Sequence, residues 1–369
     1  MTALKGIKKL INYFFNGVRV LSNNRIIVIV IFAFVFLLLD KTLAYRMELS
    51  NYEGDYINID GSYEKKDTTS IYYYDKKNND TDISKDIAAS DLVSCFNNKI
   101  DLNNVDSSIK GSIDSINNLF NESDRYFSFL YKDIYTGFTV SYNADAPIFT
   151  ASSIKAPAMI YLYEMASLGK VDLSEQLVYD GRFYSGGSGL LKDKEKGTSY
   201  DIDTLISYAI LASDNIAYAM LMNKYGRENV HNFWISHGTK NIFTYDTIWG
   251  ETCANDASIY MTELYNFYKT NDTYGAKLMD YFKKAEWKIL TNKEGVHNTA
   301  NKGGWSNEYF HDIGIVFEEN PYILVVMSKS GNDYSDYTYL FNKASILAGE
   351  LHENYWKYKV SECNKIKQY

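Results

Sequence analysis

The sequence predicts an α+β domain in which strands from both chain ends form one antiparallel sheet, packed with a mainly helical region and preceded by an N-terminal membrane anchor. Three observations lead to this prediction. Patterns typical of strands occur near residues 126–150 and again near 312–328. The interval between them is dominated by apolar helical runs. A run of 14 apolar residues occupies positions 26–39.

Composition limits the possible classes of protein. The chain has 369 residues, of which 46% are hydrophobic and 23% charged, so a fully disordered chain is excluded. A net charge of −8 argues against a nucleic-acid partner. The three cysteines are widely spaced and form no Cys-x-x-Cys, and their odd number excludes a complete disulfide framework but allows one bridge. We therefore expect no metal and no cofactor.

Charge is distributed unevenly along the chain. Residues 1–46 hold seven basic groups and one acid, for +6, so residues 47–369 carry −8 − 6 = −14. We interpret residues 1–25 as a basic amphipathic segment in the cytoplasm and 26–45 as a transmembrane signal-anchor. The acidic body then lies outside the cell. A signal peptide cleaved near Ala44 is the alternative.

The rest of the chain divides into a tether, a domain and a tail. Residues 46–88 are polar and lack periodicity, which indicates a flexible extracellular tether. Residues 89–362 are expected to form the domain, and 363–369 a short tail. Helices are predicted over 104–121, 153–168, 203–225 and 337–360. Strands are predicted around the turn at 135–137 and over 312–317 and 322–328.

The sharpest local feature is Ser152 with Lys155, at the start of an apolar helix. Residues three apart share a helix face, and a lysine held in a dry site can accept the proton of a serine hydroxyl. Ser-x-x-Lys also occurs at 62–65, in the tether, and at 107–110, on an amphipathic helix where a solvated face is the simplest interpretation. For the third pair the simpler alternative is that Ser152 caps the helix and Lys155 lies at the surface.

Two further motifs follow in order. Ser213-Asp214-Asn215 stands between two apolar helical runs, where it is either an ordinary turn or a source of polar groups for a cleft. Lys302-Gly303-Gly304 leads to the strand predicted at 313–317, and glycines there let a substrate lie along the strand edge. Residues 329–331, Lys-Ser-Gly, are an alternative match to this third motif. They follow the last predicted strand, so we interpret them as a loop.

Serine–lysine, Ser-Asp-Asn and Lys-x-Gly in this order resemble the motif set of class A β-lactamase-like serine hydrolases, within the superfamily of penicillin-binding proteins and serine β-lactamases. The resemblance spans roughly residues 100–360 and implies a β-lactamase/transpeptidase-like fold. It implies that Ser152 is the acylated nucleophile and Lys155 its proton partner. Ser213 would relay a proton to the leaving group, and Lys302 would hold the substrate carboxylate.

The resemblance also implies the positions that bind substrate. Asn215 would bind the substrate amide, and Gly303 and Gly304 would lie along the substrate. The backbone N–H groups of Ser152 and Trp305 would form the oxyanion hole.

The sequence departs from the family at three points. In the family, a glutamate in a Glu-x-x-Leu-Asn stretch activates the deacylating water, and no such stretch lies between the second and third motifs. Glu251 is the candidate for this role, although a surface carboxylate is its simpler interpretation. Gly303 replaces the family's Thr or Ser. No arginine follows Arg227, so His311 is a candidate cation, although a partly exposed structural histidine is the simpler expectation.

These features predict a membrane-anchored extracytoplasmic serine hydrolase that forms an acyl-serine with β-lactams or related amides and deacylates slowly. A D-Ala-D-Ala carboxypeptidase or penicillin-binding protein acting on peptidoglycan is one alternative. A non-catalytic sensor of cell-wall fragments is another. The pattern indicates nothing about oligomeric state.

Overall fold

The computed structural model describes residues 56–58, 106–123, 125–242, 248–329 and 334–366. The predicted cytoplasmic segment, the anchor and nearly all of the predicted tether lie outside these residues. Within the described ranges, no helix combines the length and the hydropathy needed to cross a membrane.

A six-stranded sheet forms the centre of the domain, in the order β1-β3-β2-β10-β9-β8. Strands from the two ends of the domain meet where β2 pairs with β10, as the sequence predicts. All neighbours are antiparallel except β1 and β3, which run parallel. The strands are β1 (Tyr56–Asn58), β2 (Tyr126–Asp133), β3 (Thr139–Tyr142), β8 (Thr299–Ser306), β9 (Tyr309–Val316) and β10 (Tyr322–Lys329).

Two helices cover one face of the sheet. Helix α4 (Ser107–Asn121) and helix α11 (Tyr334–Ile366) lie side by side over it. Alternation along β2 explains this packing, because Phe127 and Phe129 point into the core shared with α4 and α11. Leu130 points into the other core. The predicted α+β class with its antiparallel sheet and helical region is therefore confirmed.

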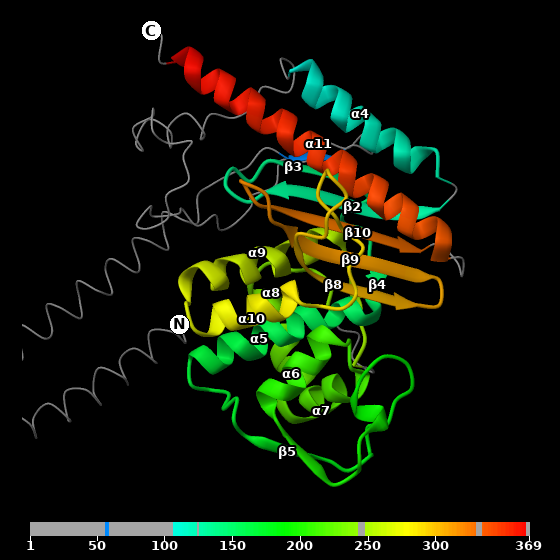
Figure 1. The fold of residues 1–369 in the computed structure, drawn as a ribbon, viewed down its shortest axis with the longest axis vertical. Coiled ribbons are helices and arrows are strands. Elements are labelled where there is room, and N and C mark those ends of the chain that lie inside the picture. The colour runs from blue at the N-terminus through cyan, green and yellow to red at the C-terminus, as the bar shows by residue number, and fades with distance from the viewer. Residues whose placement is uncertain (1–55, 59–105, 124, 243–247, 330–333, 367–369) are drawn as a thin grey trace, which may run out of the picture. The chain divides into compact units, whose positions relative to one another are not determined.

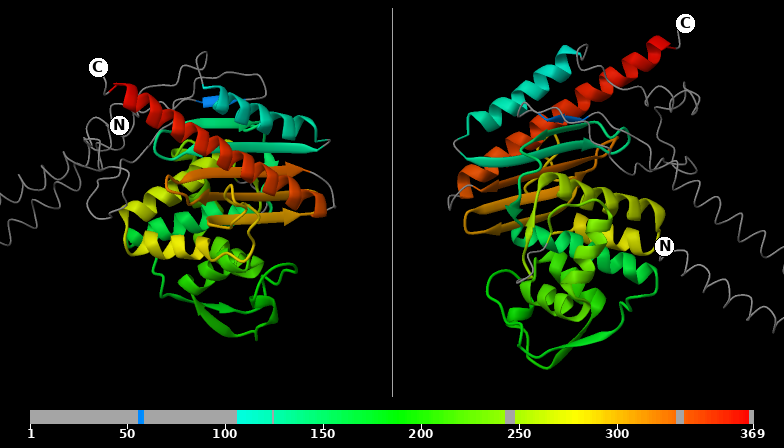
Figure 2. Two further views of the ribbon diagram at one scale, coloured as in Figure 1. Left: turned by 45° about the horizontal axis from the view of Figure 1, so that its top comes forward. Right: turned by 180° about the vertical axis from the view of Figure 1, so that it is seen from behind.

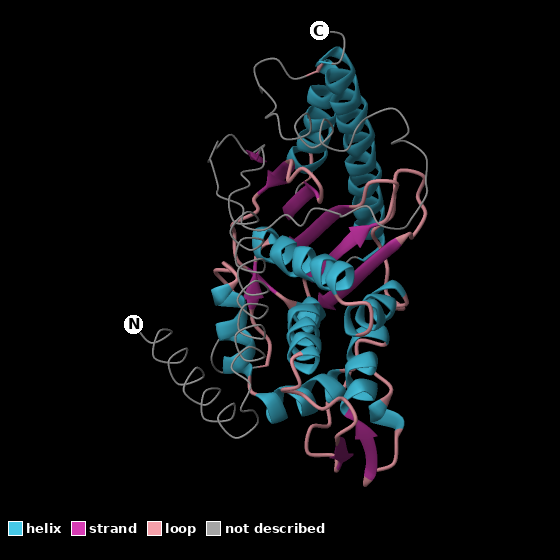
Figure 3. Ribbon diagram, turned by 90° about the vertical axis from the view of Figure 1, so that its left-hand side faces the viewer, coloured by secondary structure: helices cyan, strands magenta, loops and turns pink. Residues whose placement is uncertain are grey.

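The other face of the sheet carries the larger helical region (Figures 2 and 3). Helix α5 is central to it and is buried along most of its length, which is why its sequence is almost continuously apolar. The helices are α5 (Lys155–Ser167), α6 (Ile202–Leu211), α7 (Asn215–Tyr225), α8 (Arg227–Ser236), α9 (Ala254–Thr270) and α10 (Tyr274–Lys283). The short elements are β4 (Ile148–Phe149), η2 (Ala151–Ile154), β5 (Gln176–Tyr179), η3 (Leu191–Asp193), β6 (Thr198–Asp201) and β7 (Glu251–Thr252).

The helical segment predicted over 203–225 forms two helices, α6 and α7, separated by the Ser-Asp-Asn turn where Asp214 caps the second helix. Two other boundaries differ from the prediction. The segment that carries Lys302 is itself a strand, β8, which pairs with β9 along its whole length. Helix α11 continues to Ile366, so the predicted tail from 363 begins inside the helix; Cys363 is buried there and disulfide-bonded.

Candidate active site

Ser152 and Lys155 lie where the short helix η2 meets α5. Ala151, just before the serine, takes a positive φ of 43°, so the chain turns sharply before the nucleophile. Lys155 is fully buried, and its Nζ donates a hydrogen bond to Ser152 Oγ at 3.0 Å. The serine hydroxyl and the amine are therefore within proton-transfer distance of each other.

Lys155 is also held by the Ser-Asp-Asn turn. Its Nζ lies 2.7 Å from the carbonyl oxygen of Ser213, 3.2 Å from Ser213 Oγ and 2.7 Å from Asn215 Oδ1. Burial, followed by the charge of Lys302, holds the pKa of Lys155 well below its usual value, against a weaker opposing effect of Asp214. A neutral amine facing Ser152 can accept its proton.

Lys302 reaches the same place from the edge strand β8. Its Nζ donates to Ser213 Oγ at 3.0 Å and to the carbonyl oxygen of Gly303 at 2.8 Å. Burial lowers the pKa of Lys302 to about 8, so at neutral pH this lysine is largely a cation. Ser213 Oγ therefore lies between an amine that can be neutral and an ammonium group, which suits a hydroxyl that relays protons.

Asp214 organises the turn that holds these groups, through the helix cap that is the ordinary alternative for this tripeptide in the sequence. One carboxylate oxygen accepts from the N–H groups of Ile216 and Ala217 at the start of α7. The other accepts from Leu190 at 2.6 Å and Leu191 at 2.7 Å, in the preceding loop. The available sequence signal was an Asp directly before an apolar helical run, which is typical of an N-cap.

The two glycines after Lys302 differ in their surroundings. A Cβ at Gly304 would lie 2.6 Å from Ser153 N and 2.8 Å from Ser152 N, so only glycine lets β8 run this close to η2. A Cβ at Gly303 would meet Trp287 O at 3.6 Å, an ordinary contact. Packing therefore requires glycine at 304 but leaves room for a side chain at 303, the position where the family carries Thr or Ser.

Two aromatic rings stand beside this edge. Trp305 is 37% exposed and Trp287 is 43% exposed, and their ring centroids are 3.9 Å apart. The sequence analysis assigned only the backbone N–H of Trp305 to the site. Its ring adds an apolar surface at the end of the strand that carries Lys302.

Glu251 and His311 lie apart from the catalytic hydrogen bonds. Glu251 is exposed on β7, in register with Phe149, so it has the surface position that was its simpler interpretation. The expectation of a partly exposed His311 is wrong, because the ring is fully buried. His311 Nε2 lies 2.7 Å from the carbonyl oxygen of Phe149, and burial lowers the pKa of His311 to about 4. A neutral, enclosed imidazole cannot replace the missing arginine.

Trp249 is a second residue that the sequence analysis missed. Its ring centroid is 5.4 Å from Lys155 Nζ. The adjacent Gly250 holds this segment against the nucleophile turn, because its carbonyl oxygen accepts from Thr150 N at 3.0 Å and from Thr150 Oγ1 at 3.1 Å. Trp249 lies between the second and third motifs, where a catalytic glutamate was expected, and an indole ring there carries no signal of a carboxylate.

Comparison with protein families gives a match over residues 112–350 to the model described as the β-lactamase enzyme family. The chain belongs to the β-lactamase enzyme family. The match covers most of the domain, and the resemblance drawn from the motifs is confirmed. Family membership makes the protein a serine hydrolase. No curated protein sequence matches the chain.

Solved structures show the same fold. PBP-A matches with a TM-score of 0.61 at 18% identity, covering 66% of this chain and 96% of PBP-A. A β-lactamase from Sphaerobacter thermophilus matches with a TM-score of 0.56 at 17% identity, covering 66% of this chain and 96% of that one. A β-lactamase from Xanthomonas campestris matches with a TM-score of 0.60 at 13% identity, covering 67% of this chain and 100% of that one. At these identities the likeness is one of fold.

Proposed function

We propose that this member of the β-lactamase enzyme family is a membrane-anchored, extracytoplasmic acyl-enzyme that reacts with β-lactams or related amides and releases the acyl group slowly. The observation that carries the proposal is the 3.0 Å hydrogen bond between Lys155 Nζ and Ser152 Oγ, in a site that favours the neutral amine. A neutral lysine beside a serine hydroxyl is what acylation requires.

The acylation step can be followed atom by atom. Ser152 Oγ bonds to the amide carbon while its proton passes to Lys155 Nζ. The carbon–nitrogen bond then breaks, and the leaving nitrogen takes the proton of Ser213 Oγ. Ser213 regains a proton from Lys155, 3.2 Å away, so the lysine returns to its neutral form. Lys302 remains charged, stabilises Ser213 and faces the substrate carboxylate.

Slow deacylation is supported by what surrounds Lys155. Its nitrogen is bonded to serine and amide oxygens and lies within 6 Å of the Tyr218 and Trp249 ring centroids. Among the described residues, no carboxylate forms an ion pair or hydrogen bond with it. A water attacking the acyl-serine needs a base, and an indole ring supplies none. The acyl group should therefore persist.

The location outside the membrane is supported by sequence alone. The +6 charge of residues 1–46 and the apolar run at 26–39 suit an anchor with a cytoplasmic N-terminus. The family's substrates among cell-wall peptides and β-lactams would then meet the domain on the outer side.

Intact-mass spectrometry of the full chain, mixed with penicillin G and sampled over time, tests the proposal. We expect one covalent adduct per chain that forms in minutes and decays slowly. Ser152→Ala should abolish it. The control is Ser153→Ala, because that neighbouring hydroxyl donates to Thr150 O instead of facing the lysines. Labelling that persists in Ser152→Ala would reject Ser152 as the nucleophile. Wild-type protein that never labels would reject the acyl-enzyme and favour a non-catalytic sensor.

A D-Ala-D-Ala carboxypeptidase is the second candidate, because Ser152, Lys155 and Ser213 could attack a peptide amide by the same acylation steps. The two activities separate in one assay. Repeated turnover of a chromogenic cephalosporin indicates a β-lactamase. A single stoichiometric burst, together with release of D-alanine from a peptide ending in D-Ala-D-Ala, indicates the carboxypeptidase.

A further inference from the structure

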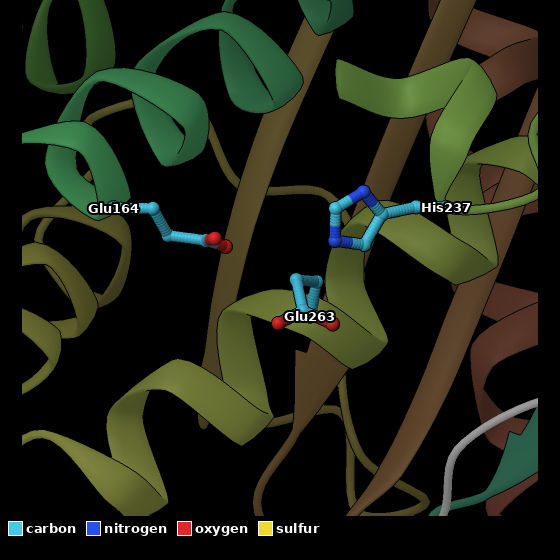
Figure 4. A group of neighbouring side chains, drawn as sticks. All are labelled: Glu164, His237 and Glu263. Atoms are coloured by element: carbon cyan, nitrogen blue, oxygen red, sulfur yellow. The ribbon is translucent and has the colours of Figure 1, made fainter. Parts of the chain in front are cut away.

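Three metal-ligating side chains converge in the helical region, away from the nucleophile. Glu164 comes from α5, His237 follows the last residue of α8, and Glu263 comes from α9 (Figure 4). Glu164 stands nine residues after Lys155 on α5, roughly 14 Å along the helix axis at 1.5 Å per residue. The cluster is therefore separate from the catalytic hydrogen bonds.

The three side chains are close enough to share one ion. One nitrogen or oxygen from each residue lies within 4.8 Å of the others. Two ligands of a tetrahedral zinc site, each about 2.1 Å from the ion, stand roughly 3.4 Å apart, so an inward movement of the side chains would complete coordination.

His237 is set for coordination by its other nitrogen. Nδ1 lies 2.7 Å from the carbonyl oxygen of Phe233, which can only accept, so Nδ1 carries a proton. Nε2 then has the lone pair, and Figure 4 shows the ring directed at the two carboxylates. The Phe233 ring, 4.1 Å from the imidazole between centroids, holds its plane. Fixing the tautomer through a backbone carbonyl is how proteins orient metal-binding histidines.

Glu164 supplies a second, independent observation. Its Oε1 is completely enclosed and has no hydrogen-bond partner. Its carboxylate also faces that of Glu263, so two acids confront each other in a partly buried space. Burying a carboxylate oxygen without a partner is costly, and a cation between the two acids would remove that cost.

We propose that Glu164, His237 and Glu263 bind one Zn²⁺ ion that ties α5 to α8 and α9. A mixed set of one imidazole and two carboxylates suits zinc, with water in the fourth position. Two carboxylates neutralise the charge of the ion. The sequence analysis expected no metal because it searched for closely spaced motifs, whereas these ligands come from three helices distant in sequence.

The test is zinc binding by the purified full chain after treatment with a chelator. Equilibrium dialysis against Zn²⁺ followed by elemental analysis should give about one ion per chain. Glu164→Gln and His237→Ala should each lower the bound zinc at least tenfold at limiting Zn²⁺. The matched control is His297→Ala, because His297 also holds a backbone carbonyl, that of Leu290, through Nδ1 but lies outside the cluster.

A melting measurement separates binding from misfolding. Zn²⁺ at about 100 times its dissociation constant should raise the Tm of the wild type and of His297→Ala by several degrees. Glu164→Gln should melt cooperatively but show no zinc-dependent rise. Wild type that binds no zinc, or cluster variants that bind as much as the control, would overturn the proposal.

Discussion

The catalytic centre and the Glu164–His237–Glu263 cluster both bury ionisable groups, yet they treat them in opposite ways. Beside Ser152, the two buried lysines have hydrogen-bond partners: Lys155 Nζ has four oxygens and Lys302 Nζ has two. In the cluster, Glu164 has an enclosed oxygen with no partner. The first arrangement is complete as it stands, whereas the second is completed by an additional charge.

The largest effect should come from removing the catalytic amine. Lys155→Ala should slow acylation by penicillin roughly 10³-fold, because Ser152 loses the group that takes its proton. The measurement is the rate of adduct formation by intact mass.

The matched control is another buried lysine, Lys132, whose pKa burial lowers to about 8 and whose Nζ donates a hydrogen bond to the Thr262 hydroxyl at 3.4 Å. Lys132→Met should leave the acylation rate within a few-fold. Equal losses in the two variants would mean that burial of a lysine, and not its place beside Ser152, matters.

The next effect tests how closely β8 must approach the nucleophile. Gly304→Ala places a Cβ under 3 Å from the backbone nitrogens of Ser152 and Ser153, so acylation should fall about 10²-fold. Gly303→Ala meets only ordinary contacts and should retain most of the activity. Adduct formation rates, with circular dichroism to check folding, compare the two, and a reversed order would contradict the geometry.

Removing one capping carboxylate should have a moderate effect on stability. Asp214→Asn loses charge-assisted bonds to four backbone N–H groups, which should lower the free energy of unfolding by about 2 kcal/mol. Asp201→Asn is the comparison, because Asp201 caps α6 through one bond, to Thr204 N. Urea unfolding measures both, and an equal loss would show that the bonds to the 190–191 loop add nothing.

The smallest effect is on the pH dependence of stability, and it arises from Glu164 in the metal-free Glu164–His237–Glu263 cluster. Burial, and then the facing Glu263, raise the pKa of Glu164 from 4.5 to about 8. Between those values the native state holds a proton that the unfolded state has lost, so stability falls as pH rises and levels off above about 8. Glu164→Gln removes this slope and should gain on the order of 1–2 kcal/mol relative to wild type between pH 5 and 8.5.

The measurement is urea unfolding in the presence of a chelator, at several pH values. Glu263 and His237 are the other titratable groups facing Glu164, and both remain in the variant. Exposed Glu228→Gln should change the slope little. A wild-type slope that Glu164→Gln leaves unaltered would show that Glu164 titrates normally, and the contrast with the catalytic centre would then weaken.

Local signals in the sequence predicted much of the fold and the motif residues that the structure brings together in the candidate site. The pair Ser152 and Lys155 depends on helical spacing of three residues, and a polar tripeptide between apolar runs marks the turn at Ser213. Short apolar runs near 312–317 and 322–328 predicted β9 and β10. Strand β8 was missed as a strand, since its Gly303-Gly304 pair has low strand propensity. Pairing with β9 determines its conformation, and contact with η2 requires Gly304.

The sequence by itself determined the α+β class, because periodicity along the chain indicates helices and strands. It also gave the order of the three motifs, and their resemblance to the class A β-lactamase-like hydrolases pointed to the family. Only the tertiary structure decided that Lys155 and Lys302 share Ser213, that His311 is enclosed and uncharged, and that Trp249 lies beside the catalytic lysine. It alone brought Glu164, His237 and Glu263 together. Burial and charge proximity depend on contacts between residues far apart in sequence, so they become visible only when the chain is folded.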